Sequence, residues 1–177
     1  MRTLHARRCI LEPLVQAHAR KMFRVLSDPA IYEFENSPPA TEEWLTKRYE
    51  RLESRGSGDG KNMWLNWVIR LPSGELAGYV QATVLPDSTS YVAYELNSRY
   101  WRQGIGSSAV QALLEELHEQ YSVKTFVAVL KAKNYRSKGL LRKVGFVPAS
   151  AEEEALYRDE PDELVMVRAS AGFEHAA

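Results

Sequence analysis

Two hydrophobic spacings recur along the chain, and they divide it into helices and strands. Apolar residues three or four positions apart predict helices, and short runs rich in β-branched and aromatic residues predict strands. We therefore expect helices at residues 14–26, 41–52, 104–121 and 133–144. We expect strands at residues 3–12, 64–71, 75–85, 91–96, 123–130, 146–157 and 164–167.

The residues between these elements predict how some of them connect. Short turns at 72–74 and 85–87 indicate that three consecutive strands form an antiparallel meander. A turn at residues 159–162 predicts a hairpin between the last two strands. Thr41 precedes two glutamates and is expected to cap its helix. Residues 55–62 are rich in glycine but lack the spacing of a Walker loop, so we expect a surface loop there.

One stretch combines a strand, a turn and a helix that begins on two glycines, Gly104 and Gly106. The first N–H groups of a helix have no partner within it and carry partial positive charge. Glycine lets a phosphate approach the backbone closely, and Arg99 and Arg102 flank the turn. The stretch therefore predicts a phosphate-binding turn. The alternative is a glycine pair that only begins a tightly packed helix.

Residues 104–109 also fit the dinucleotide pattern G-x-G-x-x-G/A. Nucleotide binding of that kind needs a carboxylate at the end of the next strand, about 20 residues on, to hold the ribose. The next predicted strand is followed by Lys131, Ala132 and Lys133, with no carboxylate. A dinucleotide-binding oxidoreductase therefore stays an alternative that this pattern disfavours.

Composition narrows the possible partners. The 177 residues include 23 basic and 23 acidic side chains, so net charge does not favour nucleic acid or a membrane surface as a partner. The length favours one domain over residues 1–170, with a frayed tail at 171–177. One cysteine, Cys9, suits a cytoplasmic protein. The four histidines show no ligand spacing, so we expect no metal.

Two motifs stand on either side of the strand at 123–130. The first, WRQGIG at residues 101–106, matches a loop of the form Gln/Arg-x-x-Gly-x-Gly/Ala except at Trp101. The second is NYRS at residues 134–137, followed by Gly-Phe at residues 145–146. With the order of elements, these motifs closely resemble the GNAT superfamily of acyl-CoA-dependent N-acetyltransferases. The resemblance is to the branch that includes the ribosomal-protein N-terminal acetyltransferases (RimJ/RimL-like), in which a tryptophan at that position is common.

The resemblance covers essentially the whole chain and implies both a fold and a cofactor. The fold is mixed α/β (α+β), with a central twisted sheet of about seven strands flanked by about four helices. The cofactor is acetyl-CoA, whose pyrophosphate would bind main-chain N–H groups at 102–107 and whose pantetheine arm would pair with the strand at 95–97. The implied cofactor-binding residues are Leu96, Asn97, Arg102, Gln103, Gly104, Ile105, Gly106, Ser107, Asn134 and Ser137. Asn134 could equally be a simple helix cap.

The chemistry needs a base for the amine, a donor for the carbonyl oxygen and an acid for the thiolate. Glu95 is the candidate base because it lies in the strand beside the expected thioester, or else it is a surface or structural carboxylate. Strand alternation places Tyr94 and Glu95 on opposite faces. The family's usual tyrosine acid falls on Leu141, so the resemblance implies Ser137 instead, with Tyr135 as a weaker candidate. Ser137 could equally hydrogen-bond the cofactor.

We therefore expect an acetyl-CoA-dependent N-acetyltransferase that works by direct attack in a ternary complex. The acceptor is a primary amine, on either a protein N-terminus or a small molecule, and the protein is a monomer or homodimer. A non-catalytic module that binds coenzyme A is a second alternative, beside the oxidoreductase.

Overall fold

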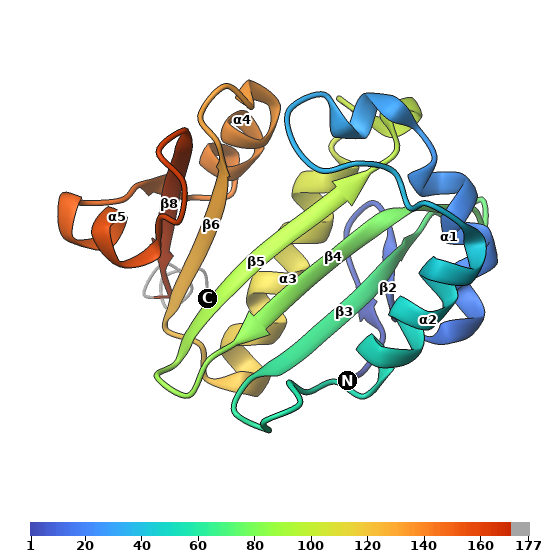
Figure 1. The fold of residues 1–177 in the computed structure, drawn as a ribbon, viewed down its shortest axis with the longest axis horizontal. Helices are drawn as coiled ribbons and strands as arrows, with labels where there is room; N and C mark the ends of the chain where they lie inside the picture. Colours follow the sequence, from blue (N-terminus) through green and yellow to red (C-terminus); the bar gives the residue numbers. More distant parts are fainter. Residues whose placement is uncertain (171–177) are drawn as a thin grey trace.

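The computed structural model describes residues 1–170, whose strands form one mixed sheet (Figure 1). The strands are β1 (Leu4–His5), β2 (Ile10–Pro13), β3 (Met63–Arg70), β4 (Leu76–Val84), β5 (Thr89–Leu96), β6 (Thr125–Lys131), β7 (Val147–Pro148) and β8 (Glu163–Ala169). The α-helices are α1 (Ala19–Leu26), α2 (Glu42–Glu53), α3 (Ile105–Tyr121), α4 (Tyr135–Lys143) and α5 (Ala151–Tyr157). Short 3-10 helices are η1 (Gln16–His18), η2 (Pro29–Tyr32) and η3 (Ser98–Tyr100).

The strand order in the sheet is β1-β2-β3-β4-β5-β6-β8-β7. The predicted mixed α/β class is confirmed, with eight strands and five α-helices in the described residues where about seven and four were expected. Among residues 1–170, no helix is both long enough and apolar enough to cross a membrane.

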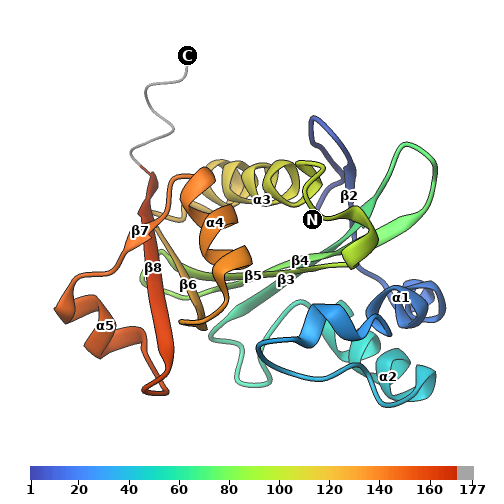
Figure 2. The same ribbon diagram turned by 90° about the horizontal axis from the view of Figure 1, so that it is seen from above.

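Side chains alternate between the two faces of the sheet, and each face has its own core. Trp67 on β3 and Val80 on β4 pack in the core that α3 covers. Their neighbours Val68 and Tyr79 pack instead with α1 and α2. Figure 2 shows α3 on one side of the sheet and α1 and α2 on the other. The face that a strand residue occupies therefore determines which helices it meets.

The predicted first strand at residues 3–12 is instead a hairpin. β1 pairs antiparallel with β2, so that Leu4 lies opposite Leu11, and Ala6 N–H donates to Cys9 O across the turn at 3.0 Å. The polar residues in the middle of the segment explain the reversal, because a turn leaves them exposed while both apolar ends reach one core. Only β2 pairs with β3.

The predicted meander of β3, β4 and β5 is confirmed as two antiparallel pairings. The helix cap at Thr41 is confirmed as well, because its Oγ1 accepts a hydrogen bond from Trp44 N–H at 3.1 Å. Gly145 ends α4 in the left-handed conformation, at φ 87°, as the sequence indicated.

β5 and β6 are parallel, but they pair only at their first residues. Their register runs from Thr89 opposite Thr125 to Tyr91 opposite Val127. Beyond Tyr91, β5 continues to Leu96 without a partner on that side, and the two strands separate (Figure 1). This separation opens one edge of a central strand in the middle of the sheet.

The predicted strand at 146–157 is wrong for most of its length. Only Val147–Pro148 is strand, and Ala151–Tyr157 forms α5. Ser150 begins this helix with a capping box, in which Ser150 Oγ accepts from Glu153 N–H and Glu153 Oε2 accepts from Ser150 N–H. Serine three residues before a glutamate is a helix-start signal in the sequence. The last two strands still pair antiparallel, with Val147 opposite Val167, but α5 lies between them, so the predicted turn at 159–162 does not join them directly.

The predicted frayed tail at 171–177 lies outside the described residues. The domain boundary at residue 170 accordingly stays a prediction.

The close approach of β4 to β5 depends on a glycine. A Cβ added to Gly78 would lie 2.0 Å from the carbonyl oxygen of Glu95. We expect Gly78→Ala to lower the free energy of unfolding by about 1–3 kcal/mol, as measured by urea denaturation. Gly139 in α4 has no atom within 4 Å of an added Cβ, so Gly139→Ala should raise stability by about 0.5–1 kcal/mol. Unchanged stability of Gly78→Ala would contradict the close approach.

Candidate active site

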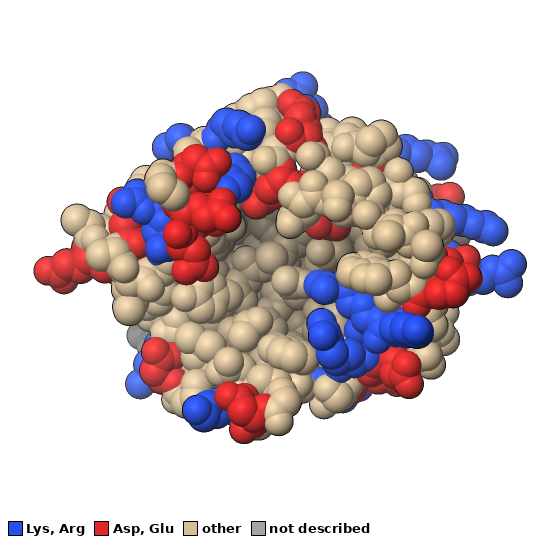
Figure 3. Space-filling view, viewed as in Figure 1, with Lys and Arg blue, Asp and Glu red and all other residues tan. Residues whose placement is uncertain are grey.

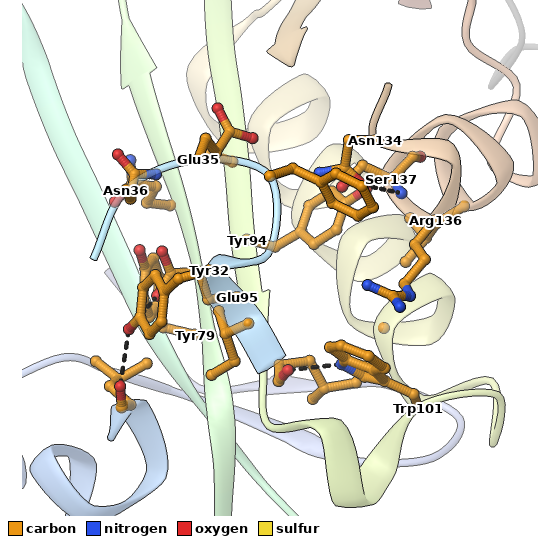
Figure 4. Close-up of a pocket in the computed structure, with 18 of the residues that line it drawn as sticks. Tyr32, Glu35, Asn36, Tyr79, Tyr94, Glu95, Trp101, Asn134, Arg136 and Ser137 are labelled. Atoms are coloured by element: carbon orange, nitrogen blue, oxygen red, sulfur yellow. Dashed lines mark hydrogen bonds between the residues drawn. The ribbon is translucent and has the colours of Figure 1, made fainter. Parts of the chain in front are cut away.

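A cavity of about 1150 Å³ lies where β5 separates from β6 (Figure 4). Its walls come from both faces of the sheet: the loop before α3 and the start of α4 on one side, and η2, α2 and β4 on the other. In the space-filling view, the face that Figure 1 presents is hollowed at its centre (Figure 3). Of the predicted site residues, those in its lining are Glu95, Leu96, Arg102, Gly104, Ile105, Gly106, Ser107, Asn134 and Ser137.

The glycine turn has the geometry of an anion site. Gly104 caps α3 in the left-handed conformation, with φ at 75°, and Arg102 is also left-handed at 59°. Ser108 N–H donates to Gly104 O at 3.1 Å, so the N–H groups of Ile105, Gly106 and Ser107 precede the first turn's hydrogen bond. These donors, at the positive end of a 17-residue helix, fit a pyrophosphate group.

The turn makes close contacts with α4 and with Arg8, and the sequence did not predict the contact with Arg8. A Cβ on Gly106 would lie 2.9 Å from Leu140 Cδ1, so the glycine lets α3 approach α4. A Cβ on Gly104 would lie 3.1 Å from Arg8 Nε, and Arg8 N–H donates to Ser108 Oγ at 3.1 Å. Arg8 therefore adds positive charge beside the turn from 96 residues earlier in the chain. Only the hairpin of β1 and β2 brings it there.

Trp101, which stands where the loop pattern has glutamine or arginine, bonds the loop to the end of β5. Its indole Nε1–H donates to Leu96 O at 2.7 Å (Figure 4). Asn97 N–H donates to Ala77 O on the β4 side. Because main-chain groups alternate along a strand, the N–H of Leu96 points away from β4, toward the separation. The strand edge therefore offers an N–H at Leu96, while the Leu96 carbonyl is already bonded.

Asn97 and Gln103, which the sequence suggested as cofactor-binding residues, are not in the cavity lining. The Asn97 amide is used within the protein: its Nδ2 donates to Val25 O at 2.9 Å and its Oδ1 accepts from Arg99 N–H at 3.2 Å. The side chain of Gln103 donates to Arg99 O at 3.0 Å. Both side chains brace the loop before α3 rather than reach the cavity.

Glu95 points to the face covered by α1 and α2, opposite to Tyr94, as strand alternation predicts (Figure 4). It lies beside Tyr79, its register partner on β4, and Tyr32 Oη is 3.4 Å from its Oε2. The Tyr32 hydroxyl also lies 2.9 Å from Leu26 O. Because a hydroxyl has one proton and the bond to Leu26 is shorter, the Glu95 carboxylate receives only weak stabilisation from Tyr32.

Burial raises the pKa of Glu95 above its ordinary value, and hydrogen bonding to Tyr79 and Tyr32 offsets this only in part. A second carboxylate, Glu35, adds to the increase because it is of like charge. The pKa of Glu35 is raised as well, chiefly by burial. Raised carboxylate pKa values in a cavity are what a general base near neutral pH requires.

The start of α4 forms the opposite wall. Asn134 caps the helix, because its Oδ1 accepts from Ser137 N–H at 3.0 Å. Tyr94 Oη donates to Ser137 O at 3.3 Å, and burial raises the pKa of Tyr94 to about 12. Hydrogen bonding to the side chain of Ser137 offsets part of this increase. Two protonated hydroxyls, on Ser137 and Tyr94, therefore lie on the α4 side of the cavity.

Leu141, at the position where many relatives carry a tyrosine, is buried in the core and offers no polar group. Tyr135, the weaker acid candidate, is 61% exposed and packs edge-on against Phe34, with ring centroids 5.7 Å apart. Arg136 lies 5.3 Å above the Phe34 ring and 4.6 Å from the Trp101 ring. This cluster connects the segment after η2 to α4.

With this geometry in view, comparison with known proteins defines the class. A family model described as an acetyltransferase (GNAT) domain matches residues 8–147. The chain therefore belongs to the GNAT acetyltransferase family, and the predicted class of acetyl-CoA-dependent N-acetyltransferase is confirmed. A search of curated proteins finds no match.

Several solved structures share the fold. RimL, a ribosomal L7/L12 α-N-protein acetyltransferase in complex with coenzyme A, has a TM-score of 0.79 and 18% identity, covering 94% of this chain and 97% of its own. A ribosomal-protein-S5-alanine acetyltransferase from Vibrio fischeri has a TM-score of 0.72 and 18% identity, covering 94% and 96%. An aminoglycoside acetyltransferase in complex with coenzyme A has a TM-score of 0.76 and 19% identity, covering 94% and 97%.

The phosphate-binding turn can be tested without loss of the helix. Ser107 lies in the first turn of α3, where an acidic residue favours the helix dipole but repels phosphate. We expect Ser107→Asp to fold normally and to lose about 10- to 100-fold in affinity for coenzyme A, or ~1.4–2.8 kcal/mol, measured by calorimetry. The control Ser107→Ala should bind nearly as wild type. Equal affinity of both variants would place the pyrophosphate elsewhere.

Proposed function

We propose that the protein transfers an acetyl group from acetyl-CoA to a primary amine by direct attack, with Glu95 as the base and Ser137 as the acid. The observation that carries this proposal is the position of Glu95 next to Leu96. One strand end thus holds a carboxylate with a raised pKa and an outward-facing N–H, in a cavity that begins at the phosphate-binding turn.

Each residue has a defined part in the reaction. Glu95 accepts a proton from the amine, directly or through a water, and so frees the nitrogen lone pair. The nitrogen forms its bond to the thioester carbonyl carbon while Leu96 N–H donates to the carbonyl oxygen, on which charge develops. The carbon–sulfur bond then breaks, and Ser137 Oγ–H gives a proton to the departing thiolate. The second proton that the attacking nitrogen loses as the amide forms returns to Ser137 Oγ, so that the hydroxyl is restored. Tyr94 is a second donor on the same wall.

The acceptor is a protein N-terminal amine or a small-molecule amine. Similar structures include enzymes whose names state ribosomal-protein and aminoglycoside acetylation, so the fold suits both classes. The proposed state in solution is a monomer or homodimer. Calorimetric titration with acetyl-CoA, coenzyme A and NADP separates this proposal from the oxidoreductase alternative, because only the two coenzyme A forms should bind.

Replacing the base should affect the chemical step and its pH dependence. We expect Glu95→Gln to lower kcat by about 10²- to 10⁴-fold with coenzyme A affinity retained. In the wild type, kcat/KM should fall as pH decreases through the pKa of Glu95, because only the ionised carboxylate accepts a proton. That pKa lies above the ordinary 4.5.

A neighbouring carboxylate provides the matched test of this pH dependence. Glu35→Gln removes a like charge that raises the pKa of Glu95, so the acidic limb should move to lower pH. An acidic limb that persists in Glu95→Gln would show that another group is the base.

The two candidate acids can be separated by single hydroxyl deletions. We expect Ser137→Ala to lower kcat at least about tenfold with unchanged coenzyme A affinity, because the thiolate would then leave without its proton donor. Tyr94→Phe should have the smaller effect on kcat. A larger effect of Tyr94→Phe would assign the acid to Tyr94 instead of Ser137.

A further inference from the structure

A second, smaller pocket of about 190 Å³ adjoins the cavity at the end away from the phosphate-binding turn. Its lining consists of Arg48, Arg51, Leu52, Trp64, Asn66, Gln81, Ala82 and Thr83. Arg48, Leu52, Asn66 and Gln81 also line the large cavity, so the two are continuous. The face of β3 and β4 on the α2 side of the sheet forms the floor of this pocket, and α2 forms its wall.

Two arginines dominate the charge of this pocket. Among the described residues, neither Arg48 nor Arg51 makes an ion pair. Their guanidinium groups lie over the rings of Trp44 and Trp64, at 5.7 and 6.0 Å from the centroids. In Figure 3, basic side chains gather on the rim of the hollow where Figure 1 shows α2. Both guanidinium groups therefore line the pocket without a carboxylate partner among the described residues.

The floor adds two amides without partners. Asn66 and Gln81 are opposite each other in the register of β3 and β4. Asn66 is only 5% exposed, yet within residues 1–170 neither side-chain amide has a hydrogen-bond partner. Both amides line the pocket and are accessible there, so a ligand or a water can bind them. Two guanidinium groups and two amides give this pocket several N–H donors, which can bind the two oxygens of a carboxylate.

The separation between this pocket and Glu95 limits what the acceptor can be. Gln81 is opposite Ala93, and Ala93 lies two residues before Glu95 on β5. Gln81 is one strand spacing across the sheet and two residues along it from Glu95, so their Cα atoms are about 8 Å apart. Asn66 is two strand spacings across, so its Cα atom is about 12 Å from that of Glu95. The amine and carboxylate of an α-amino acid are much closer together. An extended chain of about two to four residues spans this distance.

We propose that the acceptor is a peptide N-terminus with an acidic side chain about two residues further on, and that Arg48 and Arg51 bind that carboxylate. The inference rests on the proposed function, because the amine must reach Glu95. It makes Arg48 and Arg51 specificity-determining residues rather than catalytic ones. The peptide would run across the face of β4 between α2 and the sheet.

The test uses paired pentapeptides that differ only by glutamate or glutamine at the third position. We expect the wild type to prefer the glutamate peptide by about 10- to 100-fold in kcat/KM, mainly through KM. Arg48→Gln and Arg51→Gln should bring this ratio close to one. Lys47→Gln, the same charge change on an exposed position of α2 outside both pockets, should leave the ratio as in wild type.

The proposal would be overturned if the wild type acetylated the glutamate and glutamine peptides with equal kcat/KM, or if both arginine variants kept the wild-type preference. Either result would leave the proposed acetyl transfer itself intact. Acetylation of free glutamate in preference to both peptides would also overturn the proposal.

Binding gives a readout that does not need turnover: in calorimetry on the coenzyme A complex, the N-acetylated glutamate peptide should bind more tightly than its glutamine partner. If that difference depends on Arg48 and Arg51 but no peptide is acetylated, the subsite is supported and the proposed function fails. Equal binding of both peptides would contradict the subsite.

Discussion

The end of pairing between β5 and β6 is the constraint on which the site depends. A parallel pair that continued past Tyr91 and Val127 would fill the edge of β5 with hydrogen bonds. Because the strands separate, the last residues of β5 have no strand partner on the side that faces β6. The phosphate-binding turn and the N-terminus of α4 then face each other across this opening. Close packing of Gly106 against Leu140 on one side of the sheet holds the two helices at that distance.

The alternation of side chains along β5 gives Tyr94 and Glu95 separate surroundings in the cavity. Tyr94 points toward α4, where Ser137 and Asn134 lie, and in the proposed reaction this is the side of the departing thiolate. Glu95 points to the face covered by α1 and α2, where buried tyrosines surround it. In the proposed reaction the acetyl donor and the amine would therefore meet at the edge of β5. Trp101 and Arg136 connect the two sides through their ring contact and the bond to Leu96 O.

Local charge in the cavity is strongly polarised although the chain has no net charge. Glu35 and Glu95 lie in one part of the acceptor side, and Arg48 and Arg51 lie in the other. Arg48 acts on the pKa of Glu95 at a distance, without an ion pair. The net charge of the 177 residues is zero and therefore does not reveal this separation of charge within the cavity. The charge that an acceptor meets in the cavity therefore depends on the arrangement of these side chains and not on the composition of the chain.

The sequence by itself determined the elements whose signals are local. The glycine turn, the cap at Asn134 and the meander of β3 to β5 depend on residues close together in the chain, so their spacing predicts them. The alternation of Tyr94 and Glu95 follows from strand geometry alone. Where the predicted strand at 146–157 was wrong, the sequence held a competing local signal, because the capping box at Ser150 begins a helix at Ala151.

Only the tertiary structure decided which distant residues share the cavity. Arg8 reaches the phosphate-binding turn through a hairpin at the N-terminus, and Tyr32 reaches Glu95 through the placement of η2. Asn97 and Gln103 stand within the motif, yet their side chains are used inside the loop. The physical reason is that long-range packing and hydrogen bonding decide where a side chain points, and no local spacing in the chain encodes that direction.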